Sequence, residues 1–260
     1  MSDVVQVETV GATRVLTINR PHARNSLTTA VLSGLSAGLA GASTDRAVRC
    51  VILTGAGGHF CAGADLRQNL VDDPQMMERL GVHMDEFHGV VKSIVGCAKP
   101  TIAMMDGAAV GFGADLAFAC DLRVASSRAY AQEKFVRIGL MPDGGGTFWL
   151  PRLVGTARAM QMILLAEKVG AEELHRLGVV AQVVDAETLR PAALAMARRI
   201  EAGPPLAFAA IKRALYASLG PLEDALRRER EEQLALLRSG DAMEGVAAWM
   251  QKREPRFEGN

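Results

Sequence analysis

The sequence predicts an α/β protein with a partly parallel sheet, followed by a helical C-terminal region. Residues 48–54 and 101–105 are mostly apolar runs, which is typical of strands buried on both faces. Each run leads into a glycine-rich loop and then into a helical pattern. The segment from about 187 to 252 has a helical pattern throughout, interrupted at Gly203-Pro204-Pro205 and Gly220-Pro221. This order of strands, loops and helices favours one α/β core with helices at its end.

Local patterns predict the remaining elements. Two β-branched segments on either side of Gly11 predict a hairpin, with strands at 4–8 and 14–18. Apolar residues at helical spacing predict a helix over 28–42, and one or two further helices within 66–98 that begin near Asp73-Pro74. Further short strands are predicted at 121–125, 129–131 and 179–184.

Composition excludes several classes of function. The 260 residues include 29 Lys+Arg and 29 Asp+Glu, so no long-range field favours nucleic acid or anionic membrane as a partner. No apolar run reaches the roughly 18 residues of a membrane span, and the N-terminus lacks the pattern of a secretory signal. We therefore expect a cytoplasmic protein.

The cysteines and histidines show no metal-binding pattern. Four cysteines without C-x-x-C spacing are expected to be reduced, buried thiols. Five histidines form no H-E-x-x-H motif, so no metal site is predicted.

The glycine-rich stretch from Gly107 to Asp115 follows the apolar run 101–105 and precedes a helical pattern at 116–120. A strand-to-helix turn of this kind leaves backbone N–H groups unpaired at the positive end of a helix dipole. Such a turn can hold an anion, or an oxygen that becomes negative during a reaction. The stretch is therefore the first candidate for a functional site.

Two other glycine motifs match known functional patterns only in part. Gly55-Ala56-Gly57 begins like a dinucleotide fingerprint, but its third glycine falls on Phe60. Residues 34–38 match the G-x-S-x-G hydrolase pattern, but they lie within the predicted helix 28–42 rather than on a strand-to-helix elbow. We interpret that match as accidental.

Two acids, Asp115 and Asp143, stand beside glycine-rich turns. For Asp115 the alternative to catalysis is a first-turn acid that complements the helix dipole. For Asp143 the alternative is a helix N-cap before Gly144. Glu133 and Lys134 are expected to be surface groups. The residues alone leave the roles of both aspartates open.

The chain resembles the enoyl-CoA hydratase/isomerase, or crotonase, superfamily. The likeness lies in Ala62-Gly63-Ala64-Asp65 together with the stretch 106–115, and it extends from end to end. Weaker matches, specific through their order and spacing, are Asn19-Arg-Pro-x-x-x-Arg-Asn-Ser26, Lys99-Pro100, Cys120-Asp121, Gly139-Leu-Met-Pro142 and Lys252-Arg-x-Pro-x-Phe257.

The resemblance implies an α/β fold with a crotonase-like spiral of ββα units over 1–200 and a C-terminal helical trimerisation region over 201–260. It also implies a homotrimer or a dimer of trimers. The implied substrate is an acyl-CoA thioester, with coenzyme A entering as part of the substrate and no permanently bound cofactor. Backbone N–H groups at the family's two oxyanion positions, here Ala64 and Phe112, would bind the thioester oxygen.

The resemblance also implies a site for the coenzyme A portion of the substrate. Its adenine would lie against the backbone near Ala62, Asp65 and Leu66. Arg24 is the candidate for a phosphate contact, and Phe257 for lining a neighbouring subunit's site. The region 66–98 is expected to line the acyl pocket.

The chain departs from the family's hydratases, which use two glutamates to hold and activate water. The first corresponds to Asp115, and the second falls on Phe135, which cannot activate water. Glu133 lies two residues away and is expected to be a surface group rather than a second catalytic acid. The match is closer to the family's dienoyl-CoA isomerases and ring-epoxide isomerases, since an acid at the Asp143 position and the block Pro142-Asp-x-Gly-Gly-Thr147 are typical of them. The ring-epoxide isomerases generally lack an acid at the Asp115 position.

Three functions remain open at this stage. The favoured one is an isomerase in which Asp143 is the base and Asp115 the partner acid, with donors Ala64 and Phe112 stabilising an enolate. The second is a hydratase that adds water to a 2-enoyl-CoA with Asp115. The third is a weakly catalytic acyl-CoA-binding or RNA-binding member of the family.

Overall fold

The structure is a computed structural model that describes residues 4–66, 68, 76–217, 239–251, 253 and 255–260. Its first elements form the expected hairpin, in which β1 (Val5–Val10) pairs antiparallel with β2 (Thr13–Ile18). The turn between them contains Gly11 at a φ of 61°. The prediction of a hairpin around this glycine is therefore confirmed.

The main sheet has six strands in the order β1-β2-β3-β4-β6-β9. After the hairpin every pairing is parallel, as expected for an α/β protein. The four added strands are β3 (Cys50–Gly55), β4 (Thr101–Met105), β6 (Leu122–Ser126) and β9 (Gln182–Val184).

A second, smaller sheet has the order β5-β7-β8. Its strands are β5 (Ala108–Val110), β7 (Tyr130–Gln132) and β8 (Val169–Gly170). Single bridges continue this layer from Leu27 to Ala64 and from Cys61 to Ala109. Successive turns of chain thus place one strand in each layer before entering a helix, which confirms the predicted spiral of ββα units.

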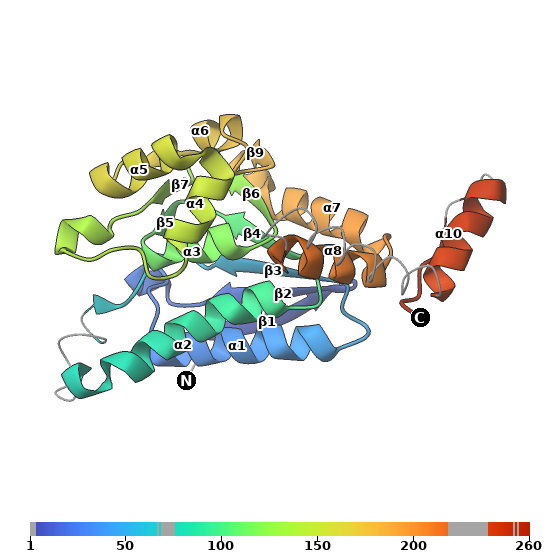
Figure 1. The fold of residues 1–260 in the computed structure, drawn as a ribbon, viewed down its shortest axis with the longest axis horizontal. Coiled ribbons are helices and arrows are strands. Elements are labelled where there is room, and N and C mark those ends of the chain that lie inside the picture. Colours follow the sequence, from blue (N-terminus) through green and yellow to red (C-terminus); the bar gives the residue numbers. More distant parts are fainter. Residues whose placement is uncertain (1–3, 67, 69–75, 218–238, 252, 254) are drawn as a thin grey trace.

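Helices cover both faces of the main sheet (Figure 1). On one face, α1 (Thr29–Thr44) and α2 (Met76–Gly96) lie side by side, and α3 (Phe112–Ala119) continues the same core. On the other face, α7 (Leu189–Glu201) packs on β2, β3, β4 and β6. The strands alternate accordingly, because Val51 and Leu53 point to the first core while Ile52 points to the second.

The remaining elements are three 3-10 segments and five α-helices within the described residues. In Figure 1, α10 projects away from the rest of the fold. The 3-10 segments are η1 (Pro21–Ala23), η3 (Phe135–Ile138) and η4 (Ala186–Thr188). The helices are α4 (Gly146–Val154), α5 (Thr156–Leu165), α6 (Ala171–Arg176), α8 (Pro205–Ala217) and α10 (Gly240–Gln251).

Three details differ from the sequence-based expectations. The glycine-rich stretch after β4 contains the extra strand β5, and α3 begins at Phe112, ahead of the helical pattern at 116–120. The strand expected over 179–184 is confined to β9. Val179 and Val180 are apolar because they are buried in the loop after α6, not because they belong to a strand. Asp73-Pro74 and Gly220-Pro221 lie outside the described residues.

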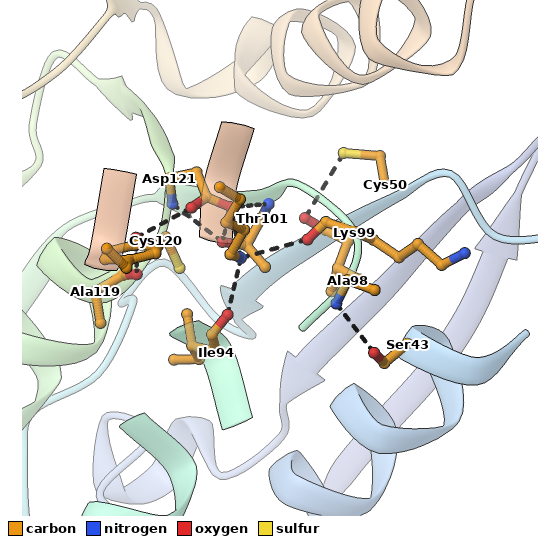
Figure 2. A network of polar contacts seen from close by, with 12 residues as sticks. Ser43, Cys50, Ile94, Ala98, Lys99, Thr101, Ala119, Cys120 and Asp121 are labelled. Atoms are coloured by element: carbon orange, nitrogen blue, oxygen red, sulfur yellow. Dashed lines mark hydrogen bonds and ion pairs between the residues drawn. The ribbon is translucent and has the colours of Figure 1, made fainter. Parts of the chain in front are cut away.

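A polar network joins the C-terminal helix α8 to the main sheet (Figure 2). Asp121 accepts hydrogen bonds from the Thr101 backbone N–H at 2.7 Å and from the Thr101 hydroxyl at 2.9 Å. The same carboxylate accepts Lys212 Nζ at 2.7 Å, and Lys212 also donates to the Ile94 carbonyl at 2.9 Å. Tyr216, one turn further along α8, donates to Asp121 at 3.0 Å. This network holds α8 against β4 and β6.

We expect the substitution Lys212→Met to destabilise the fold by about 3 kcal/mol, because it leaves a half-buried carboxylate without its cation. The Lys212 side chain is only 6% exposed, so water cannot replace it. Urea unfolding of the purified protein measures the loss. Arg190→Met, which breaks an exposed pair with Glu8, is the control and should cost less than about 1 kcal/mol. Equal effects of the two substitutions would contradict the role given to Lys212.

Candidate active site

Two glycine-containing segments meet at the edge of the second sheet. The Cys61 N–H donates to the Ala108 carbonyl at 2.9 Å, and the Val110 N–H donates to the Cys61 carbonyl at 2.9 Å. The approach is close enough that a Cβ on Gly113 would lie 2.3 Å from the Cys61 carbonyl oxygen. Glycine is therefore required there, and the two segments are fixed against each other.

The backbone N–H groups of Ala64 and Phe112 lie on these two segments. A Cβ on Gly63 would be 3.5 Å from Phe112 N, so the residue before Ala64 lies next to the start of α3. Neither N–H donates a hydrogen bond within the described part of the chain. Phe112 is the first residue of α3, so its N–H belongs to the unpaired set at the positive end of that helix. The structure thus brings together the two donors predicted from the sequence.

A cavity of about 690 Å³ opens in front of these donors. The expected acyl-pocket region contributes Leu66, His83, Met84 and Phe87 to its wall. The opposite wall comes from η3 and the loop after it, and consists of Phe135, Ile138, Leu140, Met141 and Asp143. Most of these side chains are apolar, so the cavity suits an acyl chain or ring with a polar group at the Ala64 and Phe112 N–H groups.

Asp143 is the only one of the acids discussed here that lines the cavity. Its backbone carbonyl contacts His88 Nε2 at 2.9 Å, and its Oδ1 has no hydrogen-bond partner among the described residues. Burial raises the pKa of Asp143, and the nearby His88 opposes that rise. Helix α4 begins at Gly146 with Gly145 as its N-cap, so Asp143 is not the cap of this helix.

Asp115 lies behind the cavity wall and does not line it. It is fully buried, and its Oδ2 accepts the Gly144 N–H at 3.0 Å. Burial raises the pKa of Asp115 to about 7, and the negative charge of Asp143 adds to this shift. The structure therefore separates Asp115 from Asp143, with Gly144 between them.

Glu133 is buried, and the prediction that it is a surface group is wrong. Its side chain is 1% exposed, and its Oε1 lies near Asp115 Oδ1, because a Cβ on Gly146 would be 3.3 Å from the first and 2.5 Å from the second. Burial raises the pKa of Glu133, and the neighbouring Asp115 raises it further. β7 ends at Gln132 and η3 begins at Phe135, so Glu133 lies in an irregular segment that turns its side chain into the interior. Lys134 is exposed, as expected, although it reaches the edge of the cavity. No local sequence signal identified the Glu133–Asp115 contact.

The candidate coenzyme A contacts divide into two groups. Arg24, Ala62 and Leu66 line the cavity together with Ala64. Asp65 does not line it, and its carboxylate binds the Arg20 guanidinium at 3.0 Å. Phe257 does not reach the cavity either, and its carbonyl accepts Arg49 at 3.2 Å. Its predicted contact was with a neighbouring subunit and stays a prediction.

All four cysteines are free and buried, as the sequence led us to expect. Within the described residues, histidine, cysteine and acidic side chains form no cluster of three or more that could hold a metal ion. The described helices include none that is long and apolar enough to cross a membrane.

We expect Asp115→Asn to weaken the dependence of stability on pH. The folded protein keeps a proton on Asp115 up to about pH 7, whereas the unfolded chain releases it near the ordinary value of 3.8. This group therefore stabilises the fold fully below the unfolded pKa, and the contribution is lost as pH rises through 7. The wild type should lose on the order of 3 kcal/mol relative to the variant between pH 4 and 8. Parallel stability curves from urea unfolding would contradict the raised pKa.

Comparison with known proteins identifies the family and the fold. The family model for enoyl-CoA hydratase/isomerase matches residues 8–260. In the solved enoyl-CoA hydratase of Bacillus anthracis, 30% of residues are identical, and the TM-score is 0.93 over 99% of this chain and 100% of that one. The chain therefore has the crotonase fold and belongs to the enoyl-CoA hydratase/isomerase family.

Two relatives carry different activities in their names. A probable enoyl-CoA hydratase of Rhodobacter capsulatus is 41% identical over 246 residues, which is 94% of each chain. The 1,2-epoxyphenylacetyl-CoA isomerase of Escherichia coli is 39% identical over 246 residues, again 94% of each chain. Similarity to named proteins thus leaves both hydratase and isomerase activity open. The geometry of the site is the remaining basis for choosing between them.

Proposed function

We propose that the protein is an isomerase that moves a C=C bond in an acyl-CoA thioester by proton transfer. One observation carries this proposal: Asp143 faces the same cavity as the Ala64 and Phe112 N–H groups, whereas Asp115 and Glu133 do not. A single carboxylate can remove a proton and return it elsewhere. Addition of water in the family's manner needs two carboxylates at the substrate.

In the proposed reaction, the thioester oxygen accepts hydrogen bonds from the N–H groups of Ala64 and Phe112. Asp143 removes a proton from the γ-carbon of a 2-enoyl group, or from the α-carbon of a 3-enoyl group. The electron pair delocalises onto the thioester oxygen as a dienolate, and Asp143 then returns the proton to the other carbon. The raised pKa of Asp143 makes it a stronger base than an ordinary carboxylate. Each N–H donor lowers the barrier where the negative charge develops.

Aromatic side chains limit the access of water to this intermediate. The Phe87 and Phe112 rings pack edge to face, with 4.7 Å between their centroids. Phe135 stands at the cavity wall opposite, where a Cβ on Gly111 would be 3.7 Å from its ring. An apolar wall at the position of the family's second glutamate favours proton return over water addition.

The second candidate function is hydration of a 2-enoyl-CoA. The contact between Asp115 and Glu133 favours it, because two carboxyls together are what water activation requires. Both carboxyls lie behind the cavity wall, however, and would have to reach the substrate by moving the Gly144 segment. We therefore rank hydration second. A neutral net charge argues against the RNA-binding alternative.

We also propose that Arg24 and the backbone near Ala62 and Leu66 hold the coenzyme A portion, because these residues line the same cavity as Ala64. The proposed assembly is a homotrimer or a dimer of trimers, in which residues 201–260 make the contacts between subunits.

Product analysis in D₂O tests the proposal. The protein is incubated with a 2-enoyl-CoA and, separately, with a 3-enoyl-CoA, and products are followed by mass spectrometry and NMR. We expect interconversion of the two and deuterium at the α- and γ-carbons. Formation of a 3-hydroxyacyl-CoA as the main product would establish the hydratase instead. No turnover and no exchange with either substrate would reject both activities for straight-chain acyl groups.

A further inference from the structure

Glu133 and Asp115 are neighbouring buried carboxyl groups that cannot both carry a negative charge. Both side chains are almost fully buried, with exposures of 1% and 0%. Three of their four carboxyl oxygens, Asp115 Oδ1 and both oxygens of Glu133, receive no hydrogen bond from the described residues when both groups are ionised. Two buried carboxylates in contact, without a cation, would repel each other strongly. The pair must therefore hold at least one proton.

The packing around the pair shows which groups face it. Asp115 comes from α3, Glu133 from the segment between β7 and η3, and Asp143 from the loop before α4. A Cβ on Gly146 would lie 2.5 Å from Asp115 Oδ1 and 3.3 Å from Glu133 Oε1, so a glycine backbone closes the fourth side. The charged groups that influence the pair are each other and Asp143, with His88 beyond it; no described Lys or Arg is among them.

We propose that Glu133 is a neutral carboxylic acid that donates its O–H to Asp115, and that this hydrogen bond positions Asp143 through Gly144. The donated proton fills the vacant Asp115 Oδ1, while Oδ2 holds the Gly144 N–H at 3.0 Å. Gly144 follows Asp143 directly, so the orientation of Asp115 sets the place of the base at the cavity wall. Glu133 is then a positioning residue, and the inference rests on the proposed role of Asp143.

Electrostatics support this location of the proton. Burial raises the pKa of Glu133 well above its usual range, and the negative charge and hydrogen bond of Asp115 raise it further. The hydrogen bond from Glu133 in turn lowers the pKa of Asp115 relative to its value without that donor. Burial raises the pKa of Asp143 as well, but the nearby His88 lowers it and so favours the ionised form that a base needs.

The matched variants are Glu133→Gln and Glu133→Ala. The glutamine amide can donate to Asp115 in place of the acid O–H, whereas alanine removes the donor. We expect kcat for γ-exchange to fall less than about threefold in Glu133→Gln and more than about tenfold in Glu133→Ala, with KM changed less than threefold in both. In Glu133→Ala the pKa of Asp115 rises, so the step at which the fold loses stability with rising pH should move to higher pH. In Glu133→Gln the step should stay in place.

A spectroscopic measurement keeps this test independent of the proposed activity. The infrared difference spectrum between the wild type and Glu133→Gln is recorded without substrate at a pH above the Asp115 pKa of about 7, where Asp115 is ionised. It should show the carbonyl stretch of a protonated carboxylic acid that the variant lacks. Absence of this band would overturn the protonation of Glu133. Equal kcat values and equal pH profiles for Gln and Ala would overturn its positioning role. If the band is present but no isomerisation occurs, the proposed function has failed while the acid pair stands.

Discussion

The substitution Asp143→Asn is expected to lower the rate of α- and γ-proton exchange by about 10²- to 10⁴-fold, the usual contribution of a positioned general base. Asparagine has nearly the same shape as aspartate but cannot accept a proton from carbon. Because the cavity and the two N–H donors would remain, KM should change less than about threefold. Deuterium exchange in D₂O followed by NMR measures both quantities.

The control is Asp85→Asn, which makes the same change on α2, where the side chain is exposed and does not line the cavity. Its exchange rate should stay within about twofold of wild type. In the wild type, kcat/KM should fall on the acid side at a pH above the ordinary aspartate value, because burial raises the pKa of Asp143. Retention of more than a tenth of the exchange rate in Asp143→Asn would rule this residue out as the base.

The sequence predicted the fold well because its signals are local. Buried strands such as β3 and β4 are continuous apolar runs, and the hairpin needs only Gly11 and its β-branched neighbours. Strand β5 was missed because its three residues lie inside a glycine-rich stretch that resembles a turn. Its pairing with β7 depends on contacts distant in sequence, which periodicity cannot show.

Only part of the candidate site could be predicted, because the rest depends on contacts between residues distant in sequence. The family resemblance pointed to Ala64, Phe112 and Asp143, and all three line one cavity in the structure. Spacing alone could not show that Asp115 lies behind the wall of the cavity. It also could not show that the side chain of Glu133 lies next to that of Asp115. Both facts depend on the path of the chain after β7, where an irregular segment turns Glu133 inward. Burial of an acid in such a segment leaves no periodic pattern to detect.

The substitution Gly63→Ala should lower kcat by about 10²- to 10³-fold, because it displaces the two N–H donors that no side-chain substitution can remove. Gly63 has a φ of +89°, and a Cβ there would lie 2.7 Å from the Val110 carbonyl oxygen and 3.5 Å from Phe112 N. The backbone must shift at the point where Ala64 and Phe112 meet. The strain should also lower the free energy of unfolding by about 1 to 3 kcal/mol.

Gly41→Ala separates local strain from a general effect of the added methyl group. Gly41 lies in α1 with no atom within 4 Å of the added Cβ, so this variant should keep full activity and gain about 0.5 to 1 kcal/mol. Circular dichroism and urea unfolding verify that both variants are folded. A folded Gly63→Ala protein with wild-type kcat would show that the Ala64 and Phe112 N–H groups do not stabilise the reacting oxygen. Loss of kcat with the cavity and Asp143 intact would locate that stabilisation in the backbone of these two loops.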